Sequence, residues 1–232
     1  INRRSMESKI NLMSQLIFKF PFKTKYYEQD FYVSSNNFSA YKLIENWPNW
    51  SSKWLNVFGS TGSGKTHLSK ILEKKIKNIE IINAKALEEN IIDKLENLQC
   101  LIIDNYENNI DQKFLYSLLN QSKQLENFIL INSIKPISDF KYDLPDLKSR
   151  LDSFLFIGID LPTDDLLNVI ITKSFSDKQV ELDPKVSDFI IKNVDRSYDK
   201  MFKFLKEVDE LSLSSGKPIN INLIKKELKN EK

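Results

Sequence analysis

The sequence predicts an α/β fold in which a parallel five-stranded sheet is followed by a small all-helical domain. Five short apolar runs alternate with amphipathic helical stretches, and only helical patterns follow Pro162. Short apolar strands that alternate with helices are typical of a parallel sheet covered on both faces. We expect an extended N-terminal segment over residues 1–30, an α/β domain over residues 31–160 and a helical domain over residues 161–232.

The α/β elements follow one another in a regular order along the chain. The expected strands are the apolar runs at residues 54–58, 80–82, 99–103, 127–131 and 154–159. The expected helices lie at residues 64–77, 84–98, 111–126 and 146–151, and an earlier helical pattern runs from Phe31 through Ile44. This order predicts strand–helix–strand units and therefore a parallel sheet.

Helical patterns after Pro162 cover residues 163–176, 184–193, 198–212 and 222–230. Pro184 suits the first position of its helix, directly after Asp183 as a cap. In the helix at residue 198 the apolar side chains form a stripe, which predicts packing in a core. That stripe consists of Met201, Phe202, Leu205, Val208 and Leu211.

Composition excludes several classes of protein. The 232 residues carry 34 Lys and Arg against 32 Asp and Glu, a net charge of +2 that argues against a protein that mainly coats nucleic acid or anionic lipid. One Cys and one His exclude an internal disulfide and an all-cysteine zinc site. No stretch approaches the roughly 18 apolar residues of a membrane span. We expect a cytoplasmic protein with no membrane partner.

The strongest motif is GSTGSGKT at residues 59–66, which fits the P-loop pattern between an expected strand and an expected helix. Backbone N–H groups of such a loop bind phosphate oxygens, and the helix N-terminus adds partial positive charge. An accidental Gly/Ser turn is the alternative, and the strand–turn–helix context argues against it. We expect ADP or ATP with Mg²⁺, held by Gly59, Gly62, Ser63, Gly64, Lys65, Thr66 and the adjacent His67.

A second motif, LIID, ends in Asp104, an acid that we expect beside the P-loop as a second holder of Mg²⁺ together with Thr66. Many P-loop ATPases continue with another acid, which polarises the attacking water, but here Asn105 follows. An amide orients water without accepting its proton, and loss of a general base typically costs on the order of 10²–10⁴ in rate. We therefore expect Asn105 at the catalytic position, with tight nucleotide binding and slow turnover. Glu107 is the alternative carboxylate.

Two arginines are candidates for contact with a γ-phosphate. Arg150 lies just before the last expected strand, where it is either an arginine finger toward a neighbouring subunit or a member of a surface salt bridge. Arg196 lies between two helices of the second domain and is placed to fold back onto the chain's own nucleotide. Asn132 and Ser133, at the end of the fourth strand, are candidate γ-phosphate sensors.

The N-terminal run QLIFKF alternates apolar and polar residues outside the expected core. Either it is a strand that packs back on the domain, or it is a docking peptide with Leu16, Phe18 and Phe20 in a partner's pocket and Gln15 at its edge. Burial of three such side chains gives roughly 5–9 kcal/mol gross. Association costs offset much of this, so we expect micromolar or weaker binding.

From about Met13 the chain resembles the DnaA-related AAA+ family, and within it the Hda branch. The matching stretches are GSTGSGKTHL, LIIDN, FLYSLLNQ, FILINS, LPDLKSRL, PTDD, SDKQ and DRS. The P-loop alone indicates only a nucleoside triphosphatase. The combination of LPDLKSRL, the later DRS and the leading QLIFKF is far more specific.

The resemblance implies an AAA+ P-loop domain followed by a helical lid, and it implies residue roles. Arg150 matches the arginine finger that acts in trans, and Arg196 matches the sensor 2 arginine. Phe31, Tyr32 and Val33 fall where the family's linker lines the adenine pocket. The segment with Gln15, Leu16, Phe18 and Phe20 is similar to the hexapeptide with which Hda-like proteins bind the sliding clamp of DNA polymerase III.

The family relationship implies a negative regulator of DNA replication initiation, which docks on the sliding clamp and stimulates hydrolysis of DnaA-bound ATP. Its DNA contact would be indirect, through the clamp, and its own ATPase weak. The alternatives are a helicase-loader type AAA+ ATPase with its own turnover, a nucleotide kinase, and a DnaA paralogue that only occupies a place in the initiator filament. A homo-oligomer remains a further alternative.

Overall fold

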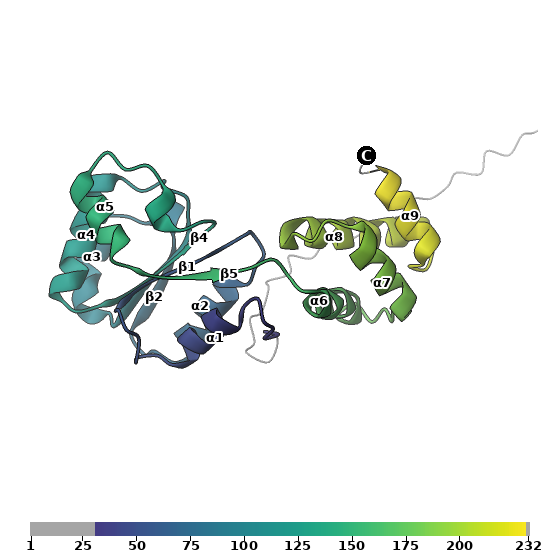
Figure 1. Ribbon diagram of the computed structural model, residues 1–232, viewed down its shortest axis with the longest axis horizontal. Helices are drawn as coiled ribbons and strands as arrows, with labels where there is room; N and C mark the ends of the chain where they lie inside the picture. The colour runs from purple at the N-terminus through teal and green to yellow at the C-terminus, as the bar shows by residue number, and fades with distance from the viewer. Residues whose placement is uncertain (1–30, 231–232) are drawn as a thin grey trace, which may run out of the picture.

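The computed structural model describes residues 31–230 and places five parallel strands at the centre of the α/β part (Figure 1). The strands are β1 (Trp54–Gly59), β2 (Ile79–Asn83), β3 (Cys100–Tyr106), β4 (Phe128–Ser133) and β5 (Leu155–Ile159). Their order across the sheet is β2-β3-β4-β1-β5, and every neighbouring pair is parallel. This arrangement confirms the predicted α/β fold class.

Helices cover both faces of the sheet (Figure 1). They are α1 (Phe38–Glu45), α2 (Lys65–Glu73), α3 (Ile91–Lys94), α4 (Gln112–Gln124) and α5 (Pro145–Asp152). One apolar cluster joins the sheet to α1 and α2, and another joins its opposite face to α3, α4 and α5. Within β3, Leu101 and Ile103 belong to the α3–α5 cluster, whereas Cys100 and Ile102 belong to the α1–α2 cluster. A strand buried on both faces therefore reads as a continuous apolar run.

The prediction of one helix over residues 84–98 is wrong. The segment forms two 3₁₀ turns, Ala84–Ala86 and Leu95–Asn97, around the single-turn α3. The apolar spacing was informative, because Ala84, Ile91 and Leu95 are all buried in the same cluster. Asn83 closes the first turn, since its side chain accepts a hydrogen bond from the backbone N–H of Lys85. Leu87 then continues in an extended conformation, at φ −76° and ψ 121°, and interrupts the helix.

The helices after the sheet form a bundle with a core of its own. They are α6 (Asp164–Ser176), α7 (Pro184–Asn193), α8 (Tyr198–Ser215) and α9 (Ile221–Asn230). The buried residues of this core all lie between Leu167 and Ile224. Asp183 caps α7, with Pro184 at its first position, as predicted. The predicted stripe on α8 is wrong at Phe202, which is 44% exposed, whereas Met201, Leu205 and Val208 are buried.

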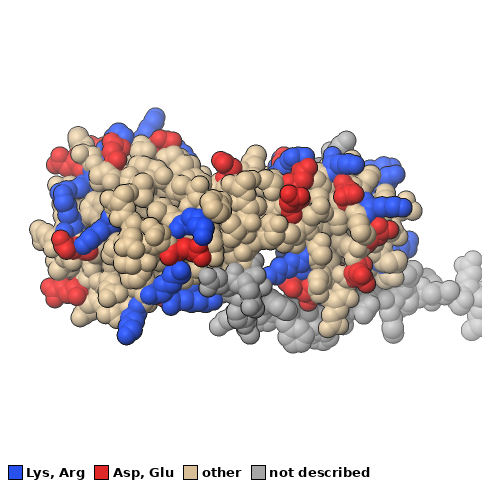
Figure 2. Space-filling model, turned by 60° about the horizontal axis from the view of Figure 1, so that its bottom comes forward, with Lys and Arg blue, Asp and Glu red and all other residues tan. Residues whose placement is uncertain are grey.

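A short connection over residues 160–163 joins the sheet to the bundle, and the bundle lies beyond one end of the sheet (Figure 1). Asn36 ties the two parts together: its Nδ2 donates to the hydroxyl of Tyr198 at 2.5 Å and to the carbonyl of Asp160 at 3.2 Å. Basic and acidic side chains are interspersed on the face that Figure 2 shows, in keeping with the near-balanced charge. Between residues 31 and 230, no helix has the length and apolar character that crossing a membrane requires.

Candidate nucleotide-binding site

The P-loop connects β1 to α2 in a conformation that depends on glycine. Gly62 and Gly64 have φ angles of 81° and 96°, in the left-handed region that disfavours other residues. Both also permit close approach, because a Cβ on Gly64 would lie 2.9 Å from Cε2 of Phe31 and one on Gly62 would lie 3.1 Å from Cβ of Tyr198. The loop therefore packs tightly against the segment before α1 and against α8.

Lys65 begins α2, and its ammonium group folds back onto the loop. Its Nζ donates to the carbonyls of Gly59 at 2.7 Å and Ser60 at 2.9 Å, and the residue is only 8% exposed. Burial lowers the pKa of Lys65, and the nearby carboxylate of Asp104 opposes that shift. The site thus holds a desolvated positive charge at a helix N-terminus, which is suited to a phosphate group.

Asp104 connects three elements at the carboxyl end of the sheet. Its Oδ2 accepts a hydrogen bond from Oγ1 of Thr66, and its Oδ1 accepts one from Nδ2 of Asn132, both at 2.8 Å. The same Nδ2 donates to Oγ of Ser69 at 2.8 Å. The structure therefore brings Asp104 and Thr66 into direct contact, as the prediction of a shared Mg²⁺ site requires. A carboxylate and a hydroxyl are hard oxygen ligands of the kind Mg²⁺ prefers, so these residues fit the ion.

Two hollows adjoin the P-loop and share Gly62, Ser63, Gly64 and Phe202 in their walls. The first, of about 420 Å³, is lined mainly by the P-loop residues and by Asn105, Glu107, Ser133 and Ile134. The second, of about 120 Å³, is mostly apolar and is lined by Phe31, Tyr32, Leu166, Val169, Ile170 and Tyr198 among others. A polar hollow with a buried lysine beside an apolar slot suits a ligand that has phosphates at one end and a flat ring at the other.

Two buried polar atoms of the site support this fit. Among the described residues, Oγ of Ser63 and Oδ1 of Asn132 are buried without a hydrogen-bond partner. Buried polar atoms are normally paired, so each of these indicates a group that a ligand or a water molecule would satisfy.

The aromatic residues before α1 are only partly where the sequence predicted. Phe31 lines the apolar slot and packs edge-on against His67, with ring centroids 5.2 Å apart. Tyr32 lines the same slot, whereas Val33 is not among the lining residues of either hollow. His67 lies in the wall of the polar hollow, as expected for a residue beside the loop.

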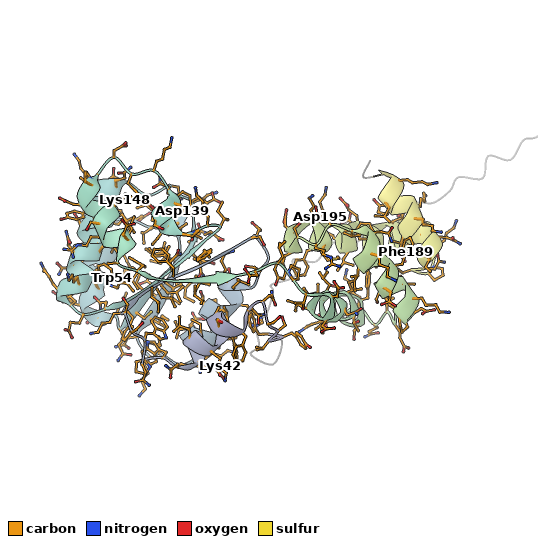
Figure 3. The ribbon with its side chains drawn as sticks, viewed as in Figure 1. Lys42, Trp54, Asp139, Lys148, Phe189 and Asp195 are labelled. Atoms are coloured by element: carbon orange, nitrogen blue, oxygen red, sulfur yellow. The ribbon has the colours of Figure 1, made fainter. Side chains whose placement is uncertain are left out.

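The two predicted arginines lie outside both hollows. Arg196 pairs with Asp164 through Nη1 and Oδ1 at 3.0 Å, and both side chains are exposed. Arg150 lies on α5, the helix of Lys148, which Figure 3 labels at the end of the molecule away from the lid. Gln15, Leu16, Phe18 and Phe20 lie outside the described residues.

The sequence did not identify two aromatic residues that close over the P-loop. Tyr198 and Phe202 from α8 lie against Gly62, and both line the apolar slot. The sequence did contain a sign that Phe202 lies outside the lid core. Met201 and Phe202 are consecutive, so their side chains are about 100° apart on the helix and cannot both lie at the centre of the buried face. For Tyr198 no local signal existed, since its partners Asn36 and Gly62 are far away in the sequence.

A P-loop after the first strand, an acid at the end of β3, the strand order β2-β3-β4-β1-β5 and a helical bundle after β5 define the AAA+ fold. A family model described as "Hda, lid domain" matches residues 165–228. The chain is accordingly a DnaA/Hda-related AAA+ protein.

Two relatives by sequence cover most of the chain. A protein of Haemophilus influenzae, described as uncharacterized, is 22% identical over 210 residues, which cover 85% of this chain and 91% of the relative. The chromosomal replication initiator protein DnaA of Buchnera aphidicola subsp. Cinara cedri is 26% identical over 229 residues, which cover 87% of this chain. The match covers 52% of that initiator, so the chain spans about half of its length.

Solved structures with the same fold include two of DnaA. Domain III of Thermotoga maritima DnaA has a TM-score of 0.71 at 18% identity and covers 91% of this chain and 98% of that one. AMPPCP-bound DnaA from Aquifex aeolicus has a TM-score of 0.65 at 20% identity, and the match covers 84% of this chain and 68% of that one. The Thermotoga maritima Holliday junction branch migration motor RuvB has a TM-score of 0.56 at 21% identity, and the match covers 76% of this chain and 61% of that one. Because the sequence identities are only 18–21%, the similarity to these structures establishes the fold of the chain alone.

Proposed function

We propose that this protein regulates the initiation of DNA replication by stimulating hydrolysis of DnaA-bound ATP, with Arg150 as an arginine finger that acts in trans. Its own polar hollow holds ADP or ATP with Mg²⁺. The relationship to DnaA and Hda supports a role in DNA replication. The observation that carries the proposal is the guanidinium of Arg150 on α5, which has no partner among the described residues and lines neither hollow beside the chain's own P-loop.

The packing of α5 fixes the position of Arg150. Leu147 and Leu151 are fully buried in the cluster on the α3–α5 face and anchor the helix. Lys148, on the same helix, donates to the carbonyl of Ser138 at 3.2 Å and pairs with Asp152 at 3.3 Å. Within residues 31–229 the guanidinium of Arg150 has neither a hydrogen bond nor an ion pair, which argues against a surface salt bridge as its role. A free guanidinium on a rigid helix is available to stabilise charge on another molecule's γ-phosphate.

The chain's own site suits retention of a nucleotide better than rapid turnover. Lys65 provides a buried cation, and Thr66 and Asp104 provide oxygen ligands for Mg²⁺, which would neutralise charge on the phosphates. Among the described residues, however, no arginine lines either hollow. Arginine fingers are worth on the order of 10³–10⁵ in turnover in known cases. We therefore propose that the bound nucleotide mainly holds the two parts of the chain together.

Docking on the DNA polymerase III sliding clamp is the second part of the proposal, and it rests on the sequence. QLIFKF carries Gln15, Leu16, Phe18 and Phe20 at the spacing of a clamp-binding peptide. The clamp would bring the protein close to DNA-bound DnaA, so that DNA is contacted only indirectly.

A reconstituted assay tests the arginine finger. DnaA loaded with radiolabelled ATP is incubated with DNA-loaded clamp and this protein, and conversion to ADP is followed by chromatography. We expect Arg150→Ala to lower stimulation by at least about a hundredfold, given the value of arginine fingers. Lys148→Ala, a cation removed from the same helix, is the control and should stimulate normally. Undiminished stimulation by Arg150→Ala would disprove the mechanism.

A pull-down with immobilised clamp tests the docking peptide separately. The triple variant with Gln15, Leu16 and Phe18 replaced by Ala should lose clamp binding and yet bind nucleotide normally. If the variant still binds the clamp, QLIFKF is not the docking segment. If the unmodified chain fails to bind, the paralogue that only occupies a place in the initiator filament becomes the better account.

A further inference from the structure

Strand β3 contains a bulge directly beside the candidate site. Its pairing with β4 matches Ile103 to Ile131 and Tyr106 to Ser133, and the register shifts between these two pairs. From Ile103 to Tyr106 is three residues along β3, whereas from Ile131 to Ser133 is two along β4. One extra residue is therefore inserted into β3 after Ile103. Bulges of this kind redirect the side chains that follow them.

Because of the bulge, the side chains at the end of β3 lie on the opposite face of the sheet from the one that simple alternation would give them. Side chains alternate along a strand, so without a bulge Tyr106 would share a face with Ile102 and Asp104. Instead Tyr106 is fully buried in the α3–α5 cluster, on the face of Ile103. Glu107, the next residue, is thereby directed to the opposite side, and it lines the polar hollow together with Lys65 and Thr66.

Asn105 is the residue displaced by the bulge. Its φ of 57° lies in the left-handed region, and it is exposed. Asparagine adopts this conformation more readily than most residues, because its short amide can bond locally. The backbone therefore gives a structural reason for Asn at this position, independent of any role in moving a proton.

We propose that Glu107 is the carboxylate that orients and deprotonates the attacking water when this chain hydrolyses its own bound ATP. The proposal rests on the nucleotide-binding part of the proposed function and is independent of the action on DnaA. In the reaction the water oxygen attacks the γ-phosphorus, and the bond from that phosphorus to the β–γ bridging oxygen breaks. ADP leaves, and the proton of the water passes to the carboxylate of Glu107 and then to solvent.

The surroundings of Glu107 leave its carboxylate able to reach water. Its charged neighbour is Lys85, with Nζ and Oε2 3.9 Å apart and both side chains more than half exposed. Such a pair is weak and does not hold the carboxylate in one place. Because no arginine is among the described residues that line the hollow, Glu107 would support only slow hydrolysis, which is consistent with a long-lived nucleotide complex.

Single-turnover hydrolysis by the isolated chain tests the proposal. Binding of a fluorescent ATP analogue is measured first, then the conversion of ATP to ADP with protein in excess. We expect Glu107→Gln to bind ATP within threefold of the unmodified chain and to hydrolyse it about 10²-fold more slowly. Glu89→Gln, the same change at an exposed carboxylate outside the hollow, is the control and should leave both quantities unchanged. Asn105→Asp, which places an acid directly after Asp104, should raise the rate by less than tenfold.

Several outcomes would overturn the role of Glu107. These are hydrolysis by Glu107→Gln at the normal rate, a hundredfold gain from Asn105→Asp, and no hydrolysis at all by an unmodified chain that binds ATP. If Glu107→Gln instead weakens ATP binding as much as it slows hydrolysis, Glu107 is a binding residue and the proposal also fails. Absence of nucleotide binding by the unmodified chain would count against the proposed function itself, and the assay with DnaA would be judged separately.

Discussion

The α/β part and the lid contribute to the nucleotide-binding hollows in different ways. The α/β part supplies charged and polar groups: Lys65 donates to the carbonyls of Gly59 and Ser60, and Asp104 accepts hydrogen bonds from Thr66 and Asn132. The lid supplies aromatic rings, with Tyr198 and Phe202 against Gly62. The phosphate-binding geometry is therefore built into the α/β part alone, whereas the apolar slot exists only while the lid is in place.

The same division applies to stability. The sheet has an apolar cluster on each face, and the lid has a separate one made only of its own residues. Between them lies a polar connection around Asn36. Its side-chain Nδ2 donates to the hydroxyl of Tyr198 and to the carbonyl of Asp160, and its carbonyl accepts a hydrogen bond from the backbone N–H of Asp160. We infer that a change in the lid core acts on the lid before it acts on the sheet, because local unfolding follows such packed units.

The largest effect is expected from Phe204→Ala. Phe204 is fully buried in the lid core, and removal of a buried Phe side chain typically costs about 3–5 kcal/mol. Hydrogen exchange read by mass spectrometry should show lost protection in α6–α9 and retained protection in β1, β3 and β4. Phe202→Ala is the matched control: the same ring two residues away is 44% exposed, so we expect less than about 1 kcal/mol. Equal losses in sheet and lid would show that the two parts unfold as one.

A smaller effect, dependent on pH, is expected from Tyr198→Phe. Burial raises the pKa of Tyr198 to about 12 from an ordinary value of 10, although the hydrogen bond from Asn36 opposes the shift. A raised pKa in the folded state means that the contribution of Tyr198 is fully present below pH 10 and is lost as the pH rises to 12. At pH 8 the variant should lose about 1 kcal/mol with its hydrogen bond. Urea titrations at pH 8 and pH 10.5 should show the unmodified chain losing more stability than the variant. Burial also raises the pKa of Tyr106 and of the partly buried Tyr142, but both are present in the unmodified chain and in the variant, so their effect cancels in the comparison.

If the difference in stability between the unmodified chain and Tyr198→Phe is the same at pH 8 and at pH 10.5, Tyr198 does not titrate as a buried group. The comparison would then point to a lid that is open for much of the time. Nucleotide should restore the difference in that case, because a ligand that touches both parts favours the closed arrangement.

Much of the fold could be predicted because the decisive signals are local. Apolar runs buried on both faces identify parallel strands, and the glycines of residues 59–64 identify the P-loop. The break of the expected helix at residues 84–98 could not be predicted from spacing, since the same apolar residues reach the core from 3₁₀ turns. The hydrogen bond from the backbone N–H of Lys85 to the side chain of Asn83 stabilises a 3₁₀ turn there in place of the α-helix that the apolar spacing predicted.

The site was predictable in its chemistry and less so in its geometry. The P-loop and the LIID motif together predicted that Thr66 and Asp104 lie side by side, and in the structure Oγ1 of Thr66 donates to Oδ2 of Asp104. The positions of Asn105 and Glu107 depend on a bulge, which arises from pairing with another strand and has no sequence signature here. The placement of Tyr198 over Gly62 depends on how the lid docks, which no local pattern records.

The smallest expected effect concerns Arg196, the residue predicted to reach the nucleotide from the lid. It pairs with Asp164 on the surface, and exposed pairs contribute about 0–1 kcal/mol, so Asp164→Asn should barely change stability. If Arg196 contacts a γ-phosphate, it must first leave Asp164. Asp164→Asn should then bind ATP about two- to fivefold more tightly, because Arg196 no longer has to break its ion pair with residue 164. The affinity for ADP should be unchanged.

Titration of fluorescent ATP and ADP analogues measures this difference. Asp165→Asn is the matched control, because both acids lie in the first turn of α6 and interact alike with the helix dipole, whereas only Asp164 pairs with Arg196. A gain in ATP affinity seen with both variants would indicate general electrostatics. A gain confined to Asp164→Asn, and absent when Arg196→Ala is added, would mean that the lid contributes a charge to the site as well as its aromatic rings. No gain in either variant would leave phosphate recognition entirely to the α/β part.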